Sequence, residues 1–163
     1  MGHFPFQILF VIYILIAAFI FAAVAFRGPY IAKRARAKVL SEPWIDARDL
    51  VRDWAGEGKY KEADGLGCYM LLVFDHEVTD GNYEGYQEVY VGKANKAYKG
   101  AYAQLTGHGK CKEIAKDYKN KNRYVYVQAR FYDKEDVNKM ERTLVGSMKA
   151  QESYNKGFKQ EED

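Results

Sequence analysis

The chain has 163 residues and a mass of 18.8 kDa, enough for one ordinary domain and one appendage but not for two full cores. It is 48% hydrophobic and 29% charged with a formal net charge of +3, yet no charged residue precedes Arg27, which excludes a simple soluble domain. The charged remainder is still rich in Tyr, Val and Leu, which excludes general disorder. Two cysteines, Cys68 and Cys111, and three isolated histidines exclude a disulfide framework and a structural zinc site.

Residues 1–26 predict a transmembrane anchor. The run from Phe6 to Phe26 contains one polar side chain, Gln7, and as a helix it would extend about 30 Å, the thickness of the hydrocarbon core of a bilayer. A cleaved signal peptide is the alternative, because Ala23-Val24-Ala25 resembles a cleavage site. The preceding MGHFPFQ lacks Lys and Arg and the apolar run is longer than a signal peptide needs, so the sequence favours a retained anchor.

Residues 27–40 form a basic juxtamembrane segment. The positive-inside rule keeps such a cluster on the cytoplasmic side, so we expect a single-pass protein of a bacterial cytoplasmic membrane with its N-terminus outside. Contact with anionic headgroups is the simpler interpretation of this cluster, and contact with nucleic acid is the alternative. The basic residues are Arg27, Lys33, Arg34, Arg36 and Lys38.

Residues 41–66 predict an N-terminal helix and a linker, with Ser41 as the helix cap and the helix ending at Gly56. Cys68 to Phe74 is a β-rich run of strand length. A turn-rich segment follows, and Glu88 to Val91 begins a second strand, so the pair predicts a hairpin with a long connection.

The second half of the chain alternates helical and strand patterns. The order α–β–β–α–β–α predicts an α+β fold, a small antiparallel sheet flanked by helices. The predicted elements are a helix from about Asn95 to Leu105, a short helix from Ile114 to Tyr118, a strand from Arg123 to Phe131 and a helix from Lys134 to Lys149 capped by Asp133.

Residues 91–125 carry nine Lys and Arg against two acidic residues, with tyrosines interleaved. Such a patch attracts phosphates and offers stacking surfaces, although a lysine-rich solvated face has the same composition. The candidate nucleic-acid-binding residues are Lys96, Lys99, Lys110 and Lys112.

Glu141 lies in the apolar stripe of the last predicted helix. The stripe comprises Val137, Met140, Leu144 and Met148, and Glu141 falls between Met140 and Leu144. A buried carboxylate needs a cation, a hydrogen-bond donor or water. A salt bridge to a neighbouring lysine, a position at the rim of the stripe and a metal-ligand role all satisfy this requirement.

Residues 67–157 resemble the GIY-YIG nuclease domain. Gly67-Cys68-Tyr69 matches GIY on the first strand and Tyr90-Val91-Gly92 matches YIG on the second. Glu141 matches the metal-binding glutamate on a late helix, and Asn155 matches the terminal asparagine. Residues 158–163 follow as a charged tail.

The resemblance implies that Glu141 binds one Mg²⁺ or Mn²⁺ and that no other cofactor is needed. It implies that Tyr69 and Tyr90 lie beside the metal, where one tyrosine acts as general base or orients the attacking water. Lys93 is the neighbour expected to lower the pKa of that tyrosine. The implied catalytic set is therefore Tyr69, Tyr90, Lys93 and Glu141, and the implied partner is nucleic acid, with DNA favoured over RNA.

Two positions depart from the family pattern. The family's phosphate-binding arginine falls at Gly100, and a histidine often found four residues later falls at Gln104. If Gly100 does align with the family's arginine, Gly100→Arg should raise the rate of any cleavage. The sequence thus predicts a membrane-anchored, metal-dependent nuclease. Two alternatives remain: a degenerate domain that binds nucleic acid or a nucleotide, and a plain membrane-anchored interaction protein.

Overall fold

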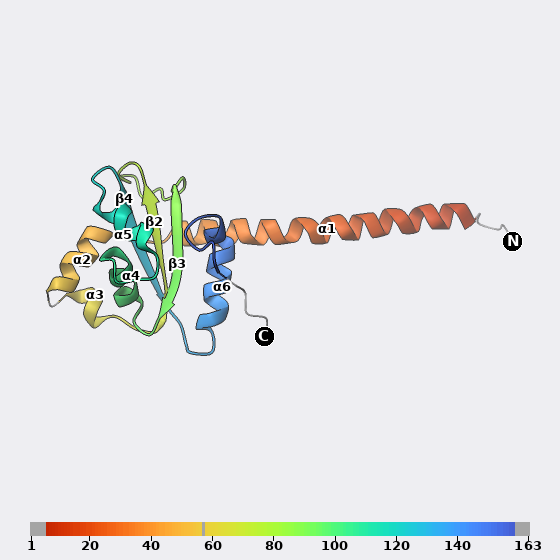
Figure 1. Cartoon of the computed structure of the whole chain (residues 1–163). Helices are drawn as coiled ribbons and strands as arrows, with labels where there is room; N and C mark the ends of the chain where they lie inside the picture. The colour runs from red at the N-terminus through yellow and green to blue at the C-terminus, as the bar shows by residue number, and fades with distance from the viewer. Residues whose placement is uncertain (1–5, 57, 159–163) are drawn as a thin grey trace.

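The computed structural model describes residues 6–56 and 58–158 and, within residues 6–27, side chains at 12–18 only. A long helix, α1 (Phe6–Leu40), leads into an α+β domain (Figure 1). In the part of the chain that the structure describes, no helix is long and apolar enough to cross a membrane. Residues 1–5 of the predicted anchor and residues 159–163 of the predicted tail lie outside the described residues.

Four antiparallel strands form one sheet in the order β1-β4-β2-β3. β2 is central and every one of its residues is buried, as expected for a strand covered on both faces. β3 is an edge strand, and its pairing with β2 sets Gly92 opposite Tyr69. The strands are β1 (Ile45–Asp46), β2 (Gly67–Phe74), β3 (Glu88–Ala94) and β4 (Tyr124–Phe131).

Helices cover both faces of the sheet, so the domain has three layers (Figure 1). Alternate residues of β2 enter two separate cores: Met70 and Leu72 pack toward one face, and Tyr69 and Leu71 pack toward the other. The C-terminal end of α1, α6 (Val137–Ser147) and the 3₁₀ turn η1 (Ala150–Glu152) cover the first face. The second face is covered by α2 (Ala47–Ala55), α3 (Lys59–Glu62), α4 (Ala97–Leu105) and α5 (Lys112–Lys119).

The α+β class and the order of the predicted elements are confirmed, but the first predicted helix is wrong at its start. Ser41 does not cap a helix; its hydroxyl donates to the carbonyl of Lys38 at 2.9 Å and closes the end of α1. Asp46 is the cap instead, because its carboxylate accepts from the backbone N–H of Arg48 at 2.7 Å. β1 ends at this cap residue and adds to the sheet a strand that was not predicted from the sequence.

The start of the last helix also differs from the prediction. The carbonyl of Asp133 accepts from the N–H groups of Asp136 and Val137, both at 3.1 Å, so residues 133–136 form a turn and α6 begins at Val137. The helix ends at Ser147 because Lys149 takes a left-handed conformation with φ of 56°. These boundaries still place Glu141 in the middle of α6.

Candidate active site

An open cavity of about 620 Å³ lies along the edge strand β3. β3 contributes Tyr90 and Lys93, the segment before α5 contributes Lys110, and α6 contributes Glu141. Asn155 lines the cavity from the C-terminal segment. The cavity thus collects side chains from both faces of the sheet at the edge where the two faces meet.

Glu141 is buried and paired. Its residue is 8% exposed, and Oε2 lies 2.8 Å from Nζ of Lys93 on β3. The same Nζ donates to Oδ1 of Asn138, one turn earlier on α6, at 2.8 Å. Of the three explanations for a charge in the apolar stripe, the salt bridge to a lysine is the arrangement found.

The oxygen atoms around Lys93 Nζ are suitable ligands for a hard cation. Glu141 Oε2 and Asn138 Oδ1 converge on one point, which the ammonium group occupies. Mg²⁺ typically takes one or two carboxylates and keeps several waters, so this donor set fits a largely hydrated Mg²⁺ or Mn²⁺ that competes with the ammonium. Within residues 6–56 and 58–158 no group of three or more His, Cys, Asp or Glu could hold a metal, and the acidic residues that line the cavity in that range are Glu113 and Glu141.

The two motif tyrosines lie side by side and share one hydrogen-bond donor. The ring centroids of Tyr69 and Tyr90 are 6.0 Å apart. Nε2 of Gln104 donates to the Tyr69 hydroxyl at 3.2 Å and to the Tyr90 hydroxyl at 3.1 Å. Oε1 of the same amide accepts from the backbone N–H of Cys111 at 3.1 Å. Gln104 therefore holds both tyrosines in place.

Burial raises the pKa of both tyrosines. For Tyr69 the hydrogen bonds with Gln104 and Tyr90 partly offset this rise, whereas the neighbouring Tyr69 raises the pKa of Tyr90 further. Lys93 is not among the main causes of either shift, and its ammonium pairs with Glu141. Both side chains are thus neutral phenols at neutral pH, suited to orienting a water by hydrogen bonds.

Gly100 gives room to the ring of Tyr69. A Cβ at this position would lie 2.6 Å from Tyr69 Cε1 and 3.0 Å from Ala94 Cβ. Gly92 has a similar function, because its Cβ would lie 2.6 Å from both Cζ and the hydroxyl of Tyr69. A side chain at this position would displace the tyrosine it was meant to assist, which argues against the expectation that Gly100→Arg raises cleavage.

The C-terminal segment covers the edge of β3. Asn155 is 8% exposed, and its amide accepts from the N–H of Val91 at 2.9 Å and donates to the carbonyl of Val91 at 2.7 Å. The hydroxyl of Ser153 accepts from the N–H of Val89 at 2.8 Å. These side chains take the place of a neighbouring strand, which satisfies the exposed edge and fixes one wall of the cavity.

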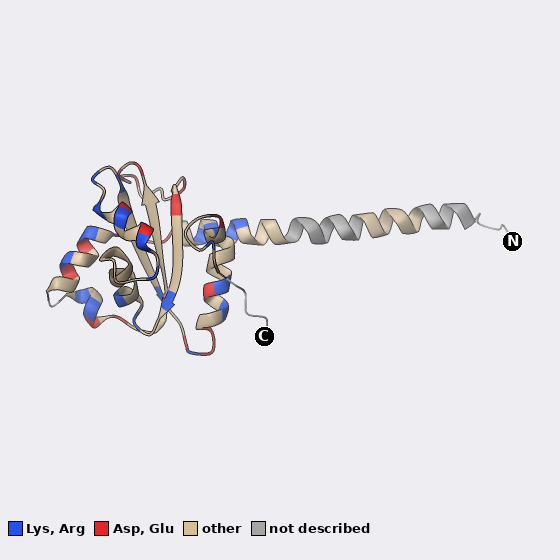
Figure 2. Cartoon of the chain, in the orientation of Figure 1, with Lys and Arg blue, Asp and Glu red and all other residues tan. Residues whose placement is uncertain are grey.

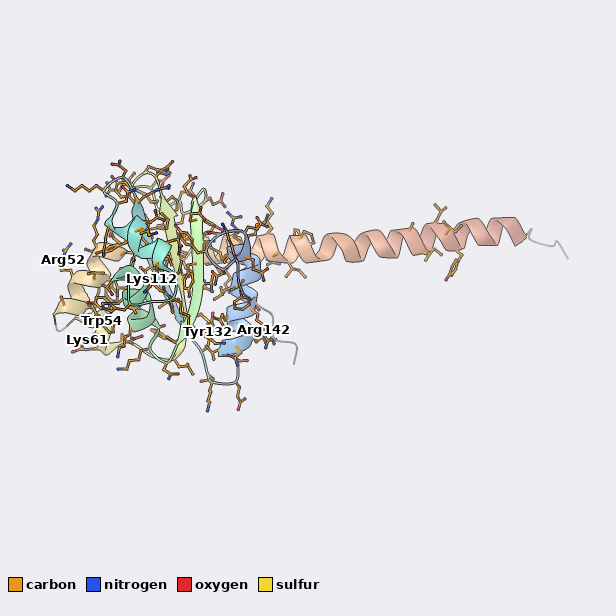
Figure 3. The ribbon with its side chains drawn as sticks, viewed as in Figure 1. Arg52, Trp54, Lys61, Lys112, Tyr132 and Arg142 are labelled. Atoms are coloured by element: carbon orange, nitrogen blue, oxygen red, sulfur yellow. The ribbon has the colours of Figure 1, made fainter. Side chains whose placement is uncertain are left out.

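The predicted nucleic-acid-binding lysines divide into two groups. Lys110 lines the cavity, whereas Lys112 on α5 donates to the carbonyl of Gly107 at 2.7 Å (Figure 3). Lys96 and Lys99 are exposed at the start of α4 and do not line the cavity. The sequence analysis missed Arg142, which lines the cavity next to Glu141.

Comparison of the chain with protein-family models, with curated proteins and with solved structures finds no match. The resemblance to GIY-YIG nucleases therefore depends on the motif residues and on their arrangement around the cavity.

Proposed function

We propose that the domain is a GIY-YIG-type nuclease that cleaves phosphodiester bonds of nucleic acid, with DNA favoured as substrate. The observation that supports the proposal is convergence: Tyr90, Lys93, Glu141 and Asn155, which are spread over 66 positions of the sequence, line one cavity, with Tyr69 packed behind Tyr90.

In this proposal Glu141, with Asn138 beside it, holds a Mg²⁺ or Mn²⁺ ion. Such an ion would neutralise charge on the scissile phosphate and assist departure of the leaving oxygen. Lys93 now pairs with Glu141 and lines the cavity, so a cation at Glu141 would free its ammonium group to contact a phosphate oxygen. The phenol of Tyr90, which lines the cavity, would stay protonated and orient the attacking water, with Tyr69 packed behind it.

Binding without cleavage is the second candidate function. It is favoured by one observation, namely that the ammonium of Lys93 already neutralises Glu141. Gly100 and Gln104 strengthen this alternative, because neither supplies the cationic side chain expected from the family pattern. A degenerate domain of this kind would bind nucleic acid or a nucleotide through the basic residues and leave it intact.

A cleavage assay separates the two candidates. The full-length chain in detergent is incubated with supercoiled DNA, single-stranded DNA and RNA in Mg²⁺ or Mn²⁺, beside Glu141→Gln and a matched control, Glu62→Gln. Glu62 is exposed on α3 and does not line the cavity. We expect cleavage by the wild type and the control and none by Glu141→Gln. Equal cleavage by all three proteins would refute the site, and salt-sensitive binding without cleavage would establish the second candidate.

We also propose that the apolar run from Phe6 to Phe26 anchors the domain to a bacterial cytoplasmic membrane in a single pass, with the domain in the cytoplasm. The support is the sequence of this run and the basic residues that follow it, such as Arg34 and Arg36. Figure 2 shows Lys and Arg on α1 where it joins the domain. A C-terminal reporter should be active in the cytoplasm, and a reporter active only in the periplasm would refute this orientation.

A further inference from the structure

A row of three aromatic rings lies on the second face of the sheet, outside the cavity. This aromatic row consists of Tyr60 on α3, Tyr98 on α4 and Phe131 at the end of β4. The ring centroids of Tyr60 and Tyr98 are 5.2 Å apart, and those of Tyr98 and Phe131 are 5.8 Å apart. Phe131 is 46% exposed, and no other large hydrophobic side chain outside α1 is exposed among the residues that the structure describes. Three segments far apart in the sequence thus bring their rings together at the surface.

The segment that leads into β2 fixes the aromatic row. The carboxylate of Asp64 accepts from the backbone N–H groups of Tyr98 and Lys99, at 2.9 and 3.0 Å, and so holds the start of α4. A Cβ at Gly65 would lie 3.6 Å from Phe131 Cδ1, so the backbone here passes close to the ring. The row is therefore formed before any ligand arrives, which lowers the entropic cost of binding.

Four exposed lysines border the aromatic row, one pair around Tyr60 and one pair around Tyr98. These lysines are Lys59, Lys61, Lys96 and Lys99. Nζ of Lys59 lies 4.7 Å from the centroid of the Tyr60 ring, which places positive charge directly against the row. The acidic residues of the same segments are Glu62 and Asp64, and the carboxylate of Asp64 is bonded to two backbone N–H groups. The surface around the row therefore suits an anionic ligand.

Aromatic rings beside lysines suit a single strand of nucleic acid. Its bases stack on aromatic rings and its phosphates are attracted to lysines, whereas a duplex keeps its bases stacked inside the helix. A bilayer does not suit this position. The C-terminal end of α1 covers the first face of the sheet, whereas the row lies on the second, and Figure 1 shows α3 on the side of the sheet away from α1.

We propose that the aromatic row is a binding site for single-stranded nucleic acid, in which a base stacks on Phe131 while Lys96 and Lys99 contact phosphates. This inference rests on the proposed function only for nucleic acid as the partner, and it depends on neither metal binding nor cleavage. The site also adjoins the cavity along the chain, because Lys96 follows the cavity residue Lys93 by three positions. A strand held on the row would thus be held close to the candidate active site.

The test measures binding of the full-length chain, in detergent, to a fluorescent oligo(dT) strand by anisotropy in EDTA, so that neither a metal ion nor cleavage contributes. Phe131→Ala should raise Kd by about 5- to 150-fold, the effect of losing one stacked base. Phe131→Leu should lose most of the same affinity, because leucine keeps the apolar bulk without a π face. Phe131→Trp should bind at least as tightly as the wild type, because the indole is also a stacking surface.

The salt dependence of the same binding tests the lysines. The double variant Lys96→Ala/Lys99→Ala should reduce the slope of log K against log salt by about 1.4, because each phosphate contact to a single strand contributes about 0.7. The matched control is Lys139→Ala/Lys156→Ala, which removes the same charge from exposed positions on α6 and in the C-terminal segment. The control should keep the wild-type slope, and an equal decrease in both double variants would overturn the proposed phosphate contacts.

The outcomes for Phe131 are equally distinct. If Phe131→Ala and Phe131→Leu are folded by far-ultraviolet circular dichroism and bind oligo(dT) as tightly as the wild type, the inference fails. It also fails if the wild type binds no strand, if it prefers a duplex, or if poly(glutamate) displaces oligo(dT) as well as unlabelled oligo(dT) does, since the last result would indicate an acidic peptide. A chain that cleaves no nucleic acid but loses strand binding in Phe131→Ala would refute the nuclease proposal and support the aromatic row. A chain that cleaves and shows no effect of Phe131 would do the reverse.

Discussion

Replacing Gly100 with alanine would place a methyl group against the ring of Tyr69. The new Cβ would lie 2.6 Å from Tyr69 Cε1, whereas carbon atoms in contact prefer about 3.5–4.0 Å. The ring has little room to retreat, because Tyr69 is 4% exposed and its hydroxyl is held by Gln104.

Two effects of opposite sign decide the outcome. Alanine is more favourable than glycine inside a helix by about 1 kcal/mol. Overpacking a filled core costs about 1–3 kcal/mol, so we expect Gly100→Ala to lower the free energy of unfolding by about 1 kcal/mol on balance. Displacement of Tyr69 should also lower any nuclease activity.

Gly146→Ala is the matched control. Gly146 lies inside α6 and a Cβ there would meet nothing within 4 Å, so this variant should be more stable than the wild type by up to about 1 kcal/mol. Urea denaturation of the full-length chain, followed by tryptophan fluorescence, measures both variants. If the two substitutions stabilise the protein equally, the proposed contact between Gly100 and Tyr69 is refuted.

Three further predictions concern charge, the strand edge and pH. Lys93→Met removes the ammonium that pairs with Glu141. Because an ion pair with an exposed partner contributes up to about 1 kcal/mol, Mn²⁺ should bind to this variant up to about fivefold more tightly than to the wild type, as measured by calorimetry. An unchanged affinity would contradict the proposed competition. Asn155→Ala leaves the N–H and C=O of Val91 without these side-chain partners, so urea denaturation should show the free energy of unfolding lowered by about 2–4 kcal/mol. A decrease below about 0.5 kcal/mol would show that the edge of β3 does not need the side chain of Asn155. Burial raises the pKa of the Cys68 thiol from 9.0 to about 12, so above pH 9 the folded state holds this proton more tightly than the unfolded state does. The resulting stability is complete below pH 9 and decreases by up to about 1.4 kcal/mol per pH unit until the folded-state pKa is reached. Cys68→Ala should show a shallower decrease between pH 9 and 10, and identical slopes in the two proteins would refute this assignment.

Much of the fold follows from local patterns in the sequence. The alternation from Tyr124 to Phe131 and the β-rich run of β2 both predict strands. A strand with one buried face alternates between apolar and polar residues, whereas a strand buried on both faces is a short continuous apolar run. β1 was missed because two residues carry no periodicity, and it forms through pairing with β4. Ser41 was misassigned because a serine ends a helix as readily as it begins one when its hydroxyl finds a carbonyl of the preceding turn.

The candidate site was predictable only in part. A charge in an apolar stripe identified Glu141, and the paired motifs identified Tyr69 and Tyr90. The bond between Lys93 and Glu141 joins residues 48 positions apart, and no local pattern predicts it. Arg142 was missed because a basic residue on an amphipathic helix is ordinarily a solvated one, and only the fold brings it to the cavity.

The central claim is that Glu141 holds a divalent cation in this cavity, and a Mn²⁺ titration of the full-length chain tests it most directly. Electron paramagnetic resonance measures the free Mn²⁺ that remains as protein is added, for the wild type, Glu141→Gln and the exposed control Glu62→Gln. We predict one bound Mn²⁺ per chain in the wild type and in the control, and loss of binding in Glu141→Gln. A wild type that binds no Mn²⁺, or a Glu141→Gln titration that matches the wild type, would contradict the claim.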